Sequence, residues 1–533
     1  RPLDFFLLSD HAEYLGVMPR LDAGDPLARS TETGERWYQL RKQKKYLEIF
    51  REFGYSMLDN RDIIENDALK KSVWQEVIAN AERYNAPGVF TTFIGFEWTA
   101  IPDGNNRHRN VLFRDGAEEA RQVVPYSSFD SLDPEDLWAY LSEYEEKTGG
   151  RALAIPHNSN VSGGQMFAVE TVGGKPLDRE YAVRRMQYEP IIEVTQYKGD
   201  SETHPILSPD DEFADYETWD KANLGGRPMH PSQLPHAYAR SALKLGLDLD
   251  ARLGVNPFKF GMIGSTDSHT GMAAGEEDNF WGKFSNAEAR ADRWKKPFFP
   301  DMGDRSGSVQ YYEWQMAASG YAAVWAHENT RAAIFDAMQR KETYATTGPR
   351  IVVRMFGGWN FEVGDEHTPD LAAKGYAEGV PMGGDLTSAS KGQVPRFLIA
   401  ANKDPEGANL DRVQVIKGWR DSGGELHERV YDVVVSGARK IGRDGRARER
   451  VGSTVDVDNA RYTNSIGAAH LGIVWMDPDF HSQQPAFYYA RVIEIPKPRW
   501  TAYDARYFGV RIGDEVPMVT QDRAYTSPIW YTP

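Results

Sequence analysis

Short apolar runs alternate with longer amphipathic stretches over the first 350 residues of the chain. Short apolar runs are typical of buried strands, whereas apolar positions spaced three and four residues apart are typical of helices. The alternation of the two predicts an α/β fold. The expected strands are Phe5–Leu8, Phe90–Phe96, Asn110–Phe113, Ala152–Ile155, Ile191–Val194 and Phe258–Ile263.

One helix has clear boundaries in the sequence, and two segments have no clear period. Asp133 is a good N-cap, Pro134 suits a first turn, and Gly149–Gly150 would end the helix. Residues 199–240 and 271–315 are long, rich in Gly, Pro and aromatic residues, and weakly periodic. Long loops of this kind often serve as functional lids or oligomer contacts. A packed surface excursion explains the same pattern equally well.

The pattern changes after Tyr344. Turn dipeptides such as Gly383–Gly384, Gly423–Gly424 and Asp444–Gly445 separate short alternating runs, which predicts an antiparallel, sandwich-like β region. The last segment is rich in Pro and Tyr, and we expect it to return to the first domain. The predicted division is therefore 1–343, an α/β domain; 344–489, a β-rich domain; and 490–533, a segment that packs back on the first.

Composition narrows the classes of function. The chain has 62 basic and 78 acidic side chains, a net charge of −16, and no cysteine. An acidic surface argues against a nucleic-acid partner, because phosphate backbones require clustered Lys and Arg. The lack of cysteine excludes disulfides, thiolate nucleophiles and Cys-ligated zinc. No apolar run is long enough for a membrane span. A metal, if bound, must be held by His, Asp, Glu or Asn.

Six metal-capable side chains follow or end the expected strands, where an α/β fold usually places its active site. Buried polar groups at such positions are costly unless a metal or a hydrogen bond satisfies them. A single histidine of this kind is more often structural, but five such positions, one of them the Asp267–His269 pair, favour a multinuclear metal site. These candidate ligands are His11, Glu97, His108, His157, Asp267 and His269.

A second group of residues lies beside these candidates. Asp10 and Glu13 are candidate catalytic groups, which would orient a ligand or a water molecule. Arg107, Asn158 and Lys198 are candidate substrate-binding residues, since a cation can clamp an anionic group. Solvated loop charges or turn caps explain each of them equally well. The same holds for two further acidic residues, Asp200 and Glu202.

The order of these motifs resembles the PHP superfamily, which is named for polymerase-associated and histidinol-phosphatase members. The order is Asp-His, Gly-x-Glu, a His before an apolar strand, a His after one, and Asp-x-His. Four longer strings resemble more closely a large bacterial branch known as domain of unknown function 3604. These strings are Asp10–Gly16, Gly264–Gly271, Tyr344–Arg350 and Tyr525–Tyr531.

This resemblance implies a distorted seven-stranded (β/α) barrel with the β-rich region appended. It also implies two or three divalent metal ions, of Mn, Zn, Fe or Mg. In the implied arrangement His11 and His269 share a first metal with Asp267. Glu97 bridges two others, and His108 and His157 join Glu97 on the second.

One motif of the superfamily is absent from this sequence. Its opening His-x-His strand is not present, and we expect it upstream of Arg1, where it would complete the barrel. An export signal is expected in the same upstream segment, so the predicted location is periplasmic or secreted, with the cytoplasm left open.

The predicted function is hydrolysis by metal-bound hydroxide. The leading substrate class is a phosphomonoester or phosphodiester. The first alternative is a carboxyl ester, carbamate or amide on the same metal centre, since a related branch of the superfamily hydrolyses carbamates. The second alternative is a non-catalytic, metal-stabilised envelope-binding protein. The expected partner is a small-molecule substrate. The sequence leaves the oligomeric state open, homo-oligomers included.

Overall fold

All six expected strands are present in the computed structural model, which describes residues 2–299, 308–387 and 389–533. Each overlaps the apolar run that predicted it. They are β1 (Phe5–Leu7), β2 (Thr91–Trp98), β3 (Arg109–Phe113), β4 (Ala152–Pro156), β5 (Ile191–Gln196) and β7 (Gly261–Gly264). A short strand, β6 (Gly199–Asp200), forms a hairpin with β5.

The prediction of a seven-stranded (β/α) barrel is wrong. In the described part of the chain, these strands form two separate hydrogen-bonded sheets, ordered β1-β2-β3-β4 and β6-β5-β7. Strand β3 runs antiparallel to both of its neighbours. A (β/α) barrel needs parallel strands, each joined to the next by a crossover of a dozen or more residues. The link between β2 and β3, residues 99–108, contains only a single 3-10 turn, so the chain reverses direction there.

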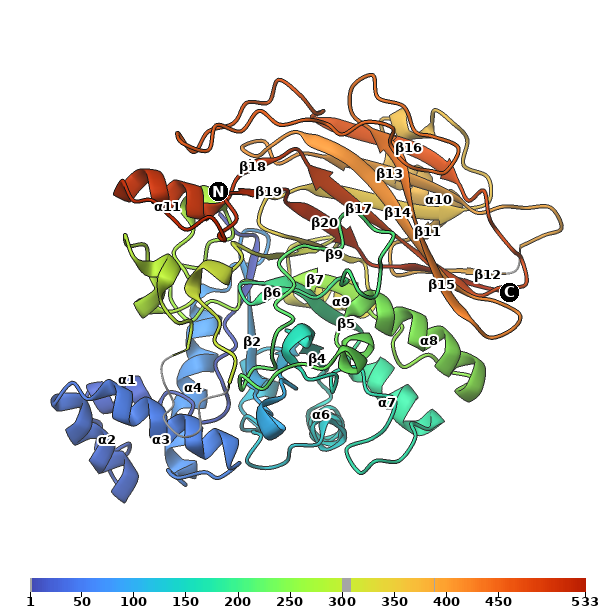
Figure 1. Ribbon diagram of the computed structural model, residues 1–533. Helices are drawn as coiled ribbons and strands as arrows, with labels where there is room; N and C mark the ends of the chain where they lie inside the picture. The colour runs from blue at the N-terminus through green and yellow to red at the C-terminus, as the bar shows by residue number, and fades with distance from the viewer. Residues whose placement is uncertain (1, 300–307, 388) are drawn as a thin grey trace.

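Helices cover the first sheet and extend to one end of the molecule (Figure 1). The predicted helix at Asp133 is confirmed: α6 starts with Pro134, the Asp133 carboxylate accepts the Glu135 N–H at 3.0 Å, and Gly149 ends it with φ 74°. The helices are α1 (Val17–Asp22), α2 (Glu32–Lys42), α3 (Tyr46–Leu58), α4 (Asp67–Tyr84), α5 (Ala117–Ala120), α6 (Pro134–Thr148), α7 (Arg179–Tyr188), α8 (Ala239–Leu253), α9 (Arg331–Gln339), α10 (Leu371–Glu378) and α11 (Trp500–Phe508).

The second half of the chain is built mainly of antiparallel β-structure (Figure 1, yellow to red). An eight-stranded sheet holds β8 (Tyr321–Val324), β9 (Thr343–Thr346), β12 (Asp385–Thr387), β14 (Leu410–Arg420), β15 (Leu426–Val435), β17 (Ala486–Glu494), β20 (Arg523–Thr526) and β21 (Ile529–Thr532). A four-stranded sheet holds β10 (Val352–Gly358), β11 (Gly379–Pro381), β13 (Arg396–Asn402) and β16 (His470–Met476). A two-stranded sheet joins β18 (Lys497–Pro498) to β19 (Val519–Thr520).

A shared hydrophobic core holds the two larger β-sheets together. Inward side chains of β10 and β13, such as Met355 and Phe397, are fully buried in the same cluster as Val415 and Tyr488 of β14 and β17. Alternating positions of each strand supply these residues, as expected when one face of a sheet is covered.

The two weakly periodic segments pack against each other. Trp219 of the first stacks on Tyr311 of the second, with ring centroids 4.3 Å apart, and Phe298 contacts Trp219 edge-on. All three belong to one buried cluster. In the described part of the chain, no helix is long and apolar enough to span a membrane.

Candidate metal centre

The reversed strand β3 brings three candidate ligands to the same edge of the first sheet. Glu97 lies near the end of β2, His108 directly precedes β3, and His157 directly follows β4. Because β3 is antiparallel to both neighbours, its start lies beside the ends of β2 and β4. The His157 N–H donates to the His108 carbonyl at 3.4 Å, which extends the ladder by one step.

Three imidazole nitrogens surround one carboxylate oxygen, Oε1 of Glu97. His108 Nδ1 lies 2.7 Å from it, His157 Nε2 3.4 Å and His11 Nδ1 3.5 Å. Oε1 is buried and has no partner with full hydrogen-bond geometry, although His108 Nδ1 is at hydrogen-bond distance. Potential ligand atoms of Glu97, His108 and His157 all lie within 4.8 Å of one another. Donors about 2.0–2.1 Å from a tetrahedral zinc ion lie about 3.3 Å apart. The spacings of His157 and His11 from Oε1 are close to this value, and the spacing of His108 is shorter.

Burial and charge set the protonation of this cluster. Burial raises the pKa of Glu97, but His11 and His157 outweigh it and hold that pKa well below its ordinary value. Burial lowers the pKa of His108 to about 4, against the opposing effect of Glu97. Burial also lowers the pKa of His157, yet the Glu97 carboxylate raises it more. An anionic carboxylate beside a neutral imidazole is the state that a divalent metal requires.

His11 and His269 meet beside this cluster. His11 continues the parallel ladder of β1 and β2 by bridging to Glu97, which fixes its backbone. Its Nδ1 lies 2.6 Å from the Thr99 hydroxyl, and its Nε2 lies 3.3 Å from His269 Nε2. Both imidazoles remain partly exposed, with 32% of each side chain accessible, so they form the solvent-facing side of the centre.

Asp267 differs from the other candidates, because protein cations already surround its carboxylate. Lys198 Nζ contacts Oδ2, and Lys283 Nζ lies 2.7 Å from Oδ1. The Gln196 amide donates to Oδ2 at 2.8 Å. Burial raises the pKa of Asp267, but the two lysines outweigh it and hold that pKa well below its ordinary value. Lys198, a predicted substrate-binding residue, is therefore a partner of Asp267.

Side-chain amides orient the histidines. The Asn110 amide nitrogen lies 3.3 Å from His157 Nδ1, and the Asn106 amide donates to the His157 carbonyl at 2.7 Å. Asn158, a predicted substrate-binding residue, is fully buried with φ 55°, and its amide donates to Asn160 Oδ1 at 2.7 Å. Asn158 Oδ1 is buried and has no hydrogen-bond partner.

The two predicted catalytic acids are not part of the histidine cluster. The Asp10 side chain is exposed, and its backbone carbonyl accepts the Glu97 N–H at 2.8 Å. Glu13 is buried, and its Oε1 accepts the backbone N–H groups of Thr99 at 3.3 Å and Ser128 at 2.5 Å. Glu13 thus holds the backbone at Thr99, the residue that contacts His11.

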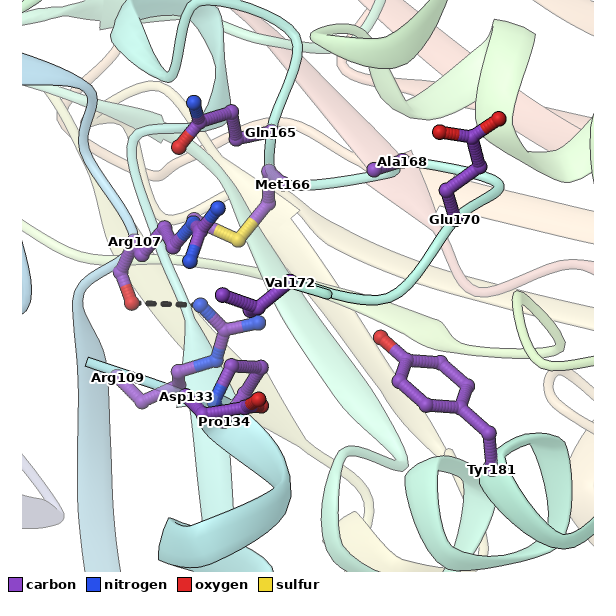
Figure 2. A pocket seen from close by; sticks show the side chains of 10 residues that line it. All are labelled: Arg107, Arg109, Asp133, Pro134, Gln165, Met166, Ala168, Glu170, Val172 and Tyr181. Atoms are coloured by element: carbon purple, nitrogen blue, oxygen red, sulfur yellow. Dashed lines mark hydrogen bonds between the residues drawn. The ribbon is translucent and has the colours of Figure 1, made fainter. Parts of the chain in front are cut away.

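Arg107 lines a separate small pocket (Figure 2). None of the six candidate ligands lines it; its walls are Arg107, Arg109, Asp133, Pro134, Gln165, Met166, Ala168, Glu170, Val172 and Tyr181. Asp200 and Glu202 also lie elsewhere, in contact with the β-rich part of the chain. Asp200 accepts a hydrogen bond from Tyr525 at 3.1 Å, and Glu202 pairs with Arg491 at 3.1 Å.

Several residues around the centre were not predicted from the sequence. Glu193 of β5 is buried, and burial raises its pKa to about 7. With Gln196 it interrupts an otherwise apolar strand, which is a pattern that could have identified both. Asn110 begins a predicted strand, and Thr99 lies three residues after another. Lys283 lies in a segment without periodicity, so its position could not be predicted.

A second group of metal-capable residues lies at the hairpin between β14 and β15. Asp421, Glu425 and His427 are close together there. Their contacts are already satisfied: His427 Nε2 lies 2.8 Å from Asp421 Oδ2, while Oδ1 accepts the backbone N–H groups of Gly423 and Glu425, both at 2.9 Å. This group is a turn stabilised by hydrogen bonds.

Comparison with known proteins identifies the family and nothing more specific. No curated protein matches the chain, and no solved structure does either. A family model described as a protein of unknown function (DUF3604) matches residues 1–533, the whole sequence. The chain therefore belongs to the DUF3604 family.

Proposed function

We propose that the protein is a metal-dependent hydrolase whose ion is held by Glu97, His108 and His157, as in the PHP superfamily that the sequence resembles. The observation that carries this proposal is the convergence of three imidazole nitrogens within 3.5 Å of the buried Glu97 Oε1, which has no partner with full hydrogen-bond geometry. Buried carboxylate oxygens are normally satisfied. A cation bound to this oxygen would satisfy it.

The residues of the chain would prepare and orient the site. A divalent ion held there would lower the pKa of a bound water toward about 7 and polarise an ester oxygen. Asn110 fixes the ring of His157 from behind, and Thr99 does the same for His11. Such contacts keep the ligand nitrogens directed at the ion. The partly exposed His11 and His269 form the side from which substrate would enter.

A phosphoester is the substrate class that the charges favour. Lys198 and Lys283 place two ammonium groups within contact of one carboxylate, next to His269. Their excess positive charge would attract a phosphoryl group and stabilise the charge that develops on it. A small-molecule phosphomonoester or phosphodiester is therefore the proposed substrate.

Carboxyl ester hydrolysis is the second candidate. Phe284 stands edge-on to the His269 ring at 5.0 Å, and Met272 and Trp281 of the same segment are exposed. An apolar wall of this kind would suit the acyl or alcohol part of a bulky organic ester.

The test is an activity screen on metal-stripped protein reconstituted with Mn²⁺, Zn²⁺, Fe²⁺ or Mg²⁺. Substrates would be p-nitrophenyl phosphate, bis(p-nitrophenyl) phosphate and p-nitrophenyl acetate. We expect metal-dependent turnover of a phosphate substrate. His157→Ala should lose both the bound metal and the turnover, by orders of magnitude, because one ligand is missing. Faster turnover of the acetate would favour the second candidate.

His204→Ala is the matched control. His204 is as buried as His157, but it pairs with Asp220 at 3.0 Å and contacts none of the candidate ligands. Its removal should lower the melting temperature and leave metal content and specific activity unchanged. An inactive wild type with every ion, or a His157→Ala variant with full metal and full activity, would refute the proposal.

A further inference from the structure

Every oxygen of Asp267 already has a protein partner. Oδ2 contacts Lys198 Nζ and accepts the Gln196 amide at 2.8 Å, while Oδ1 lies 2.7 Å from Lys283 Nζ. The backbone carbonyl of Asp267 also accepts a hydrogen bond from Lys283 Nζ. A metal ion that used this carboxylate would have to share it with an ammonium group or displace one.

Lys283 occupies the position of a cation in this arrangement. Its Nζ contacts the Asp267 carbonyl, Asp267 Oδ1 at 2.7 Å and His269 Nδ1 at 3.0 Å. An ammonium group has three donors, and these three acceptors use all of them. The Lys283 residue is only 2% exposed, so water does not compete for these contacts.

The backbone around Lys283 is built to hold this ammonium in place. The His269 N–H donates to the Lys283 carbonyl at 2.9 Å, and the next residue, Phe284, stands against the His269 ring. Asp267 has φ 52°, a left-handed conformation that is uncommon for residues other than glycine. The lysine is therefore fixed at both its backbone and its side chain.

We infer that the ammonium of Lys283, supported by Lys198, replaces the first metal ion, the one that the superfamily resemblance assigns to His11, His269 and Asp267. This inference rests on the proposed function and specifies its metal count as one ion, at Glu97, His108 and His157. While both lysines are protonated, two ammonium groups against one carboxylate leave a net positive charge at this place. The chain thus supplies part of the charge for an anionic substrate, independently of metal supply.

Counting bound metal tests this directly. The full chain would be stripped with EDTA, loaded with excess Mn²⁺, freed of unbound ion by gel filtration and analysed by elemental mass spectrometry. We expect one ion per chain in the wild type, one in Asp267→Asn and none in His157→Ala. Two ions in the wild type, falling to one in Asp267→Asn, would overturn the inference and leave the proposed function standing. No ion in the wild type would instead refute the proposed function.

A double-variant comparison in EDTA guards against misfolding of Asp267→Asn. With the carboxylate removed, Lys198 and Lys283 face each other without a counter-charge, so the melting temperature should fall. The double variant Asp267→Asn/Lys283→Met lacks one of the two ammonium groups. Its melting temperature should therefore be higher than that of Asp267→Asn alone. If Asp267 were instead a metal ligand repelled by Glu97 in the metal-free protein, Asp267→Asn would raise the melting temperature. That result, or no recovery in the double variant, would overturn the inference.

Discussion

At the scale of single residues, the ligand candidates are held from behind by neutral partners. Asn110 contacts His157, and Thr99 contacts His11. Backbone strain accompanies these contacts, since Asn158 directly after His157 has φ 55° and Asp267 has φ 52°. Non-glycine residues with positive φ are uncommon and often occur where the fold fixes a functional group.

Asn158 offers a test of that strain. Asn158→Gly keeps the left-handed backbone without cost but loses the bond to Asn160, whereas Asn158→Ala loses the bond and must also strain the backbone. We expect Ala to be less stable than Gly by about 1 kcal/mol, the order of the left-handed penalty for an L-residue. Thermal unfolding of both variants in EDTA would measure it. An Ala variant as stable as the Gly variant would show that position 158 is not strained.

At the scale of elements, the start of β3 is set by a buried group of charges. Glu189 directly follows α7. Its Oε1 accepts hydrogen bonds from Arg109 Nε at 2.9 Å and from the Trp138 indole N–H at 3.0 Å. Arg185 Nε lies 3.2 Å from its Oε2. Arg109 directly follows His108. These contacts therefore tie β3, α6 and α7 together at the point where His108 enters the centre.

Removing this carboxylate should destabilise the protein at neutral pH. Glu189→Gln leaves Arg109 and Arg185 buried without a counter-charge, which typically costs about 3–5 kcal/mol. Burial raises the pKa of Glu189, but the two arginines lower it below its ordinary value. The stabilisation is thus complete above about pH 4.3, the ordinary value for Glu, and is lost as the pH falls through the lower folded-state pKa.

Denaturation of wild type and variant across pH would check this prediction. The difference in stability should be constant near neutral pH and should shrink in acid. Glu146→Gln, at an exposed position of α6, is the control and should change little at any pH. A pH-independent difference, or none, would mean that Glu189 does not carry this charge.

The strands were more predictable from the sequence than their directions. Apolar runs predicted β1 to β5 and β7, because a buried strand consists mainly of apolar residues that are adjacent in the sequence. The direction of β3 depends on residues 99–108, whose turn the pattern did not reveal. The candidate histidines and Glu97 were identifiable because each lies within a few residues of a predicted strand. The contact of Lys283 with Asp267 could not be predicted, because Lys283 lies in a long segment without hydrophobic periodicity.

At the scale of the whole molecule, buried ion pairs connect the α/β and β-rich parts. Arg240 of α8 and Arg491 of β17 both pair with Glu202, at 2.5 and 3.1 Å, and with Asp211, at 2.9 and 2.6 Å. The eight-stranded sheet also combines strands from both sides of residue 344. These contacts join α8 and the segment from Glu202 to Asp211 to the β-rich part of the chain. Figure 1 shows α8 beside the sheet.

The most direct test of the central claim is the position of the metal itself. Crystals of the full chain grown with Zn²⁺ would be measured on both sides of the zinc absorption edge. The account predicts one anomalous peak, about 2.0–2.2 Å from donor atoms of Glu97, His108 and His157, with Lys283 still bound to Asp267. The absence of a peak at Glu97, or a peak bonded to Asp267 in place of Lys283, would contradict it.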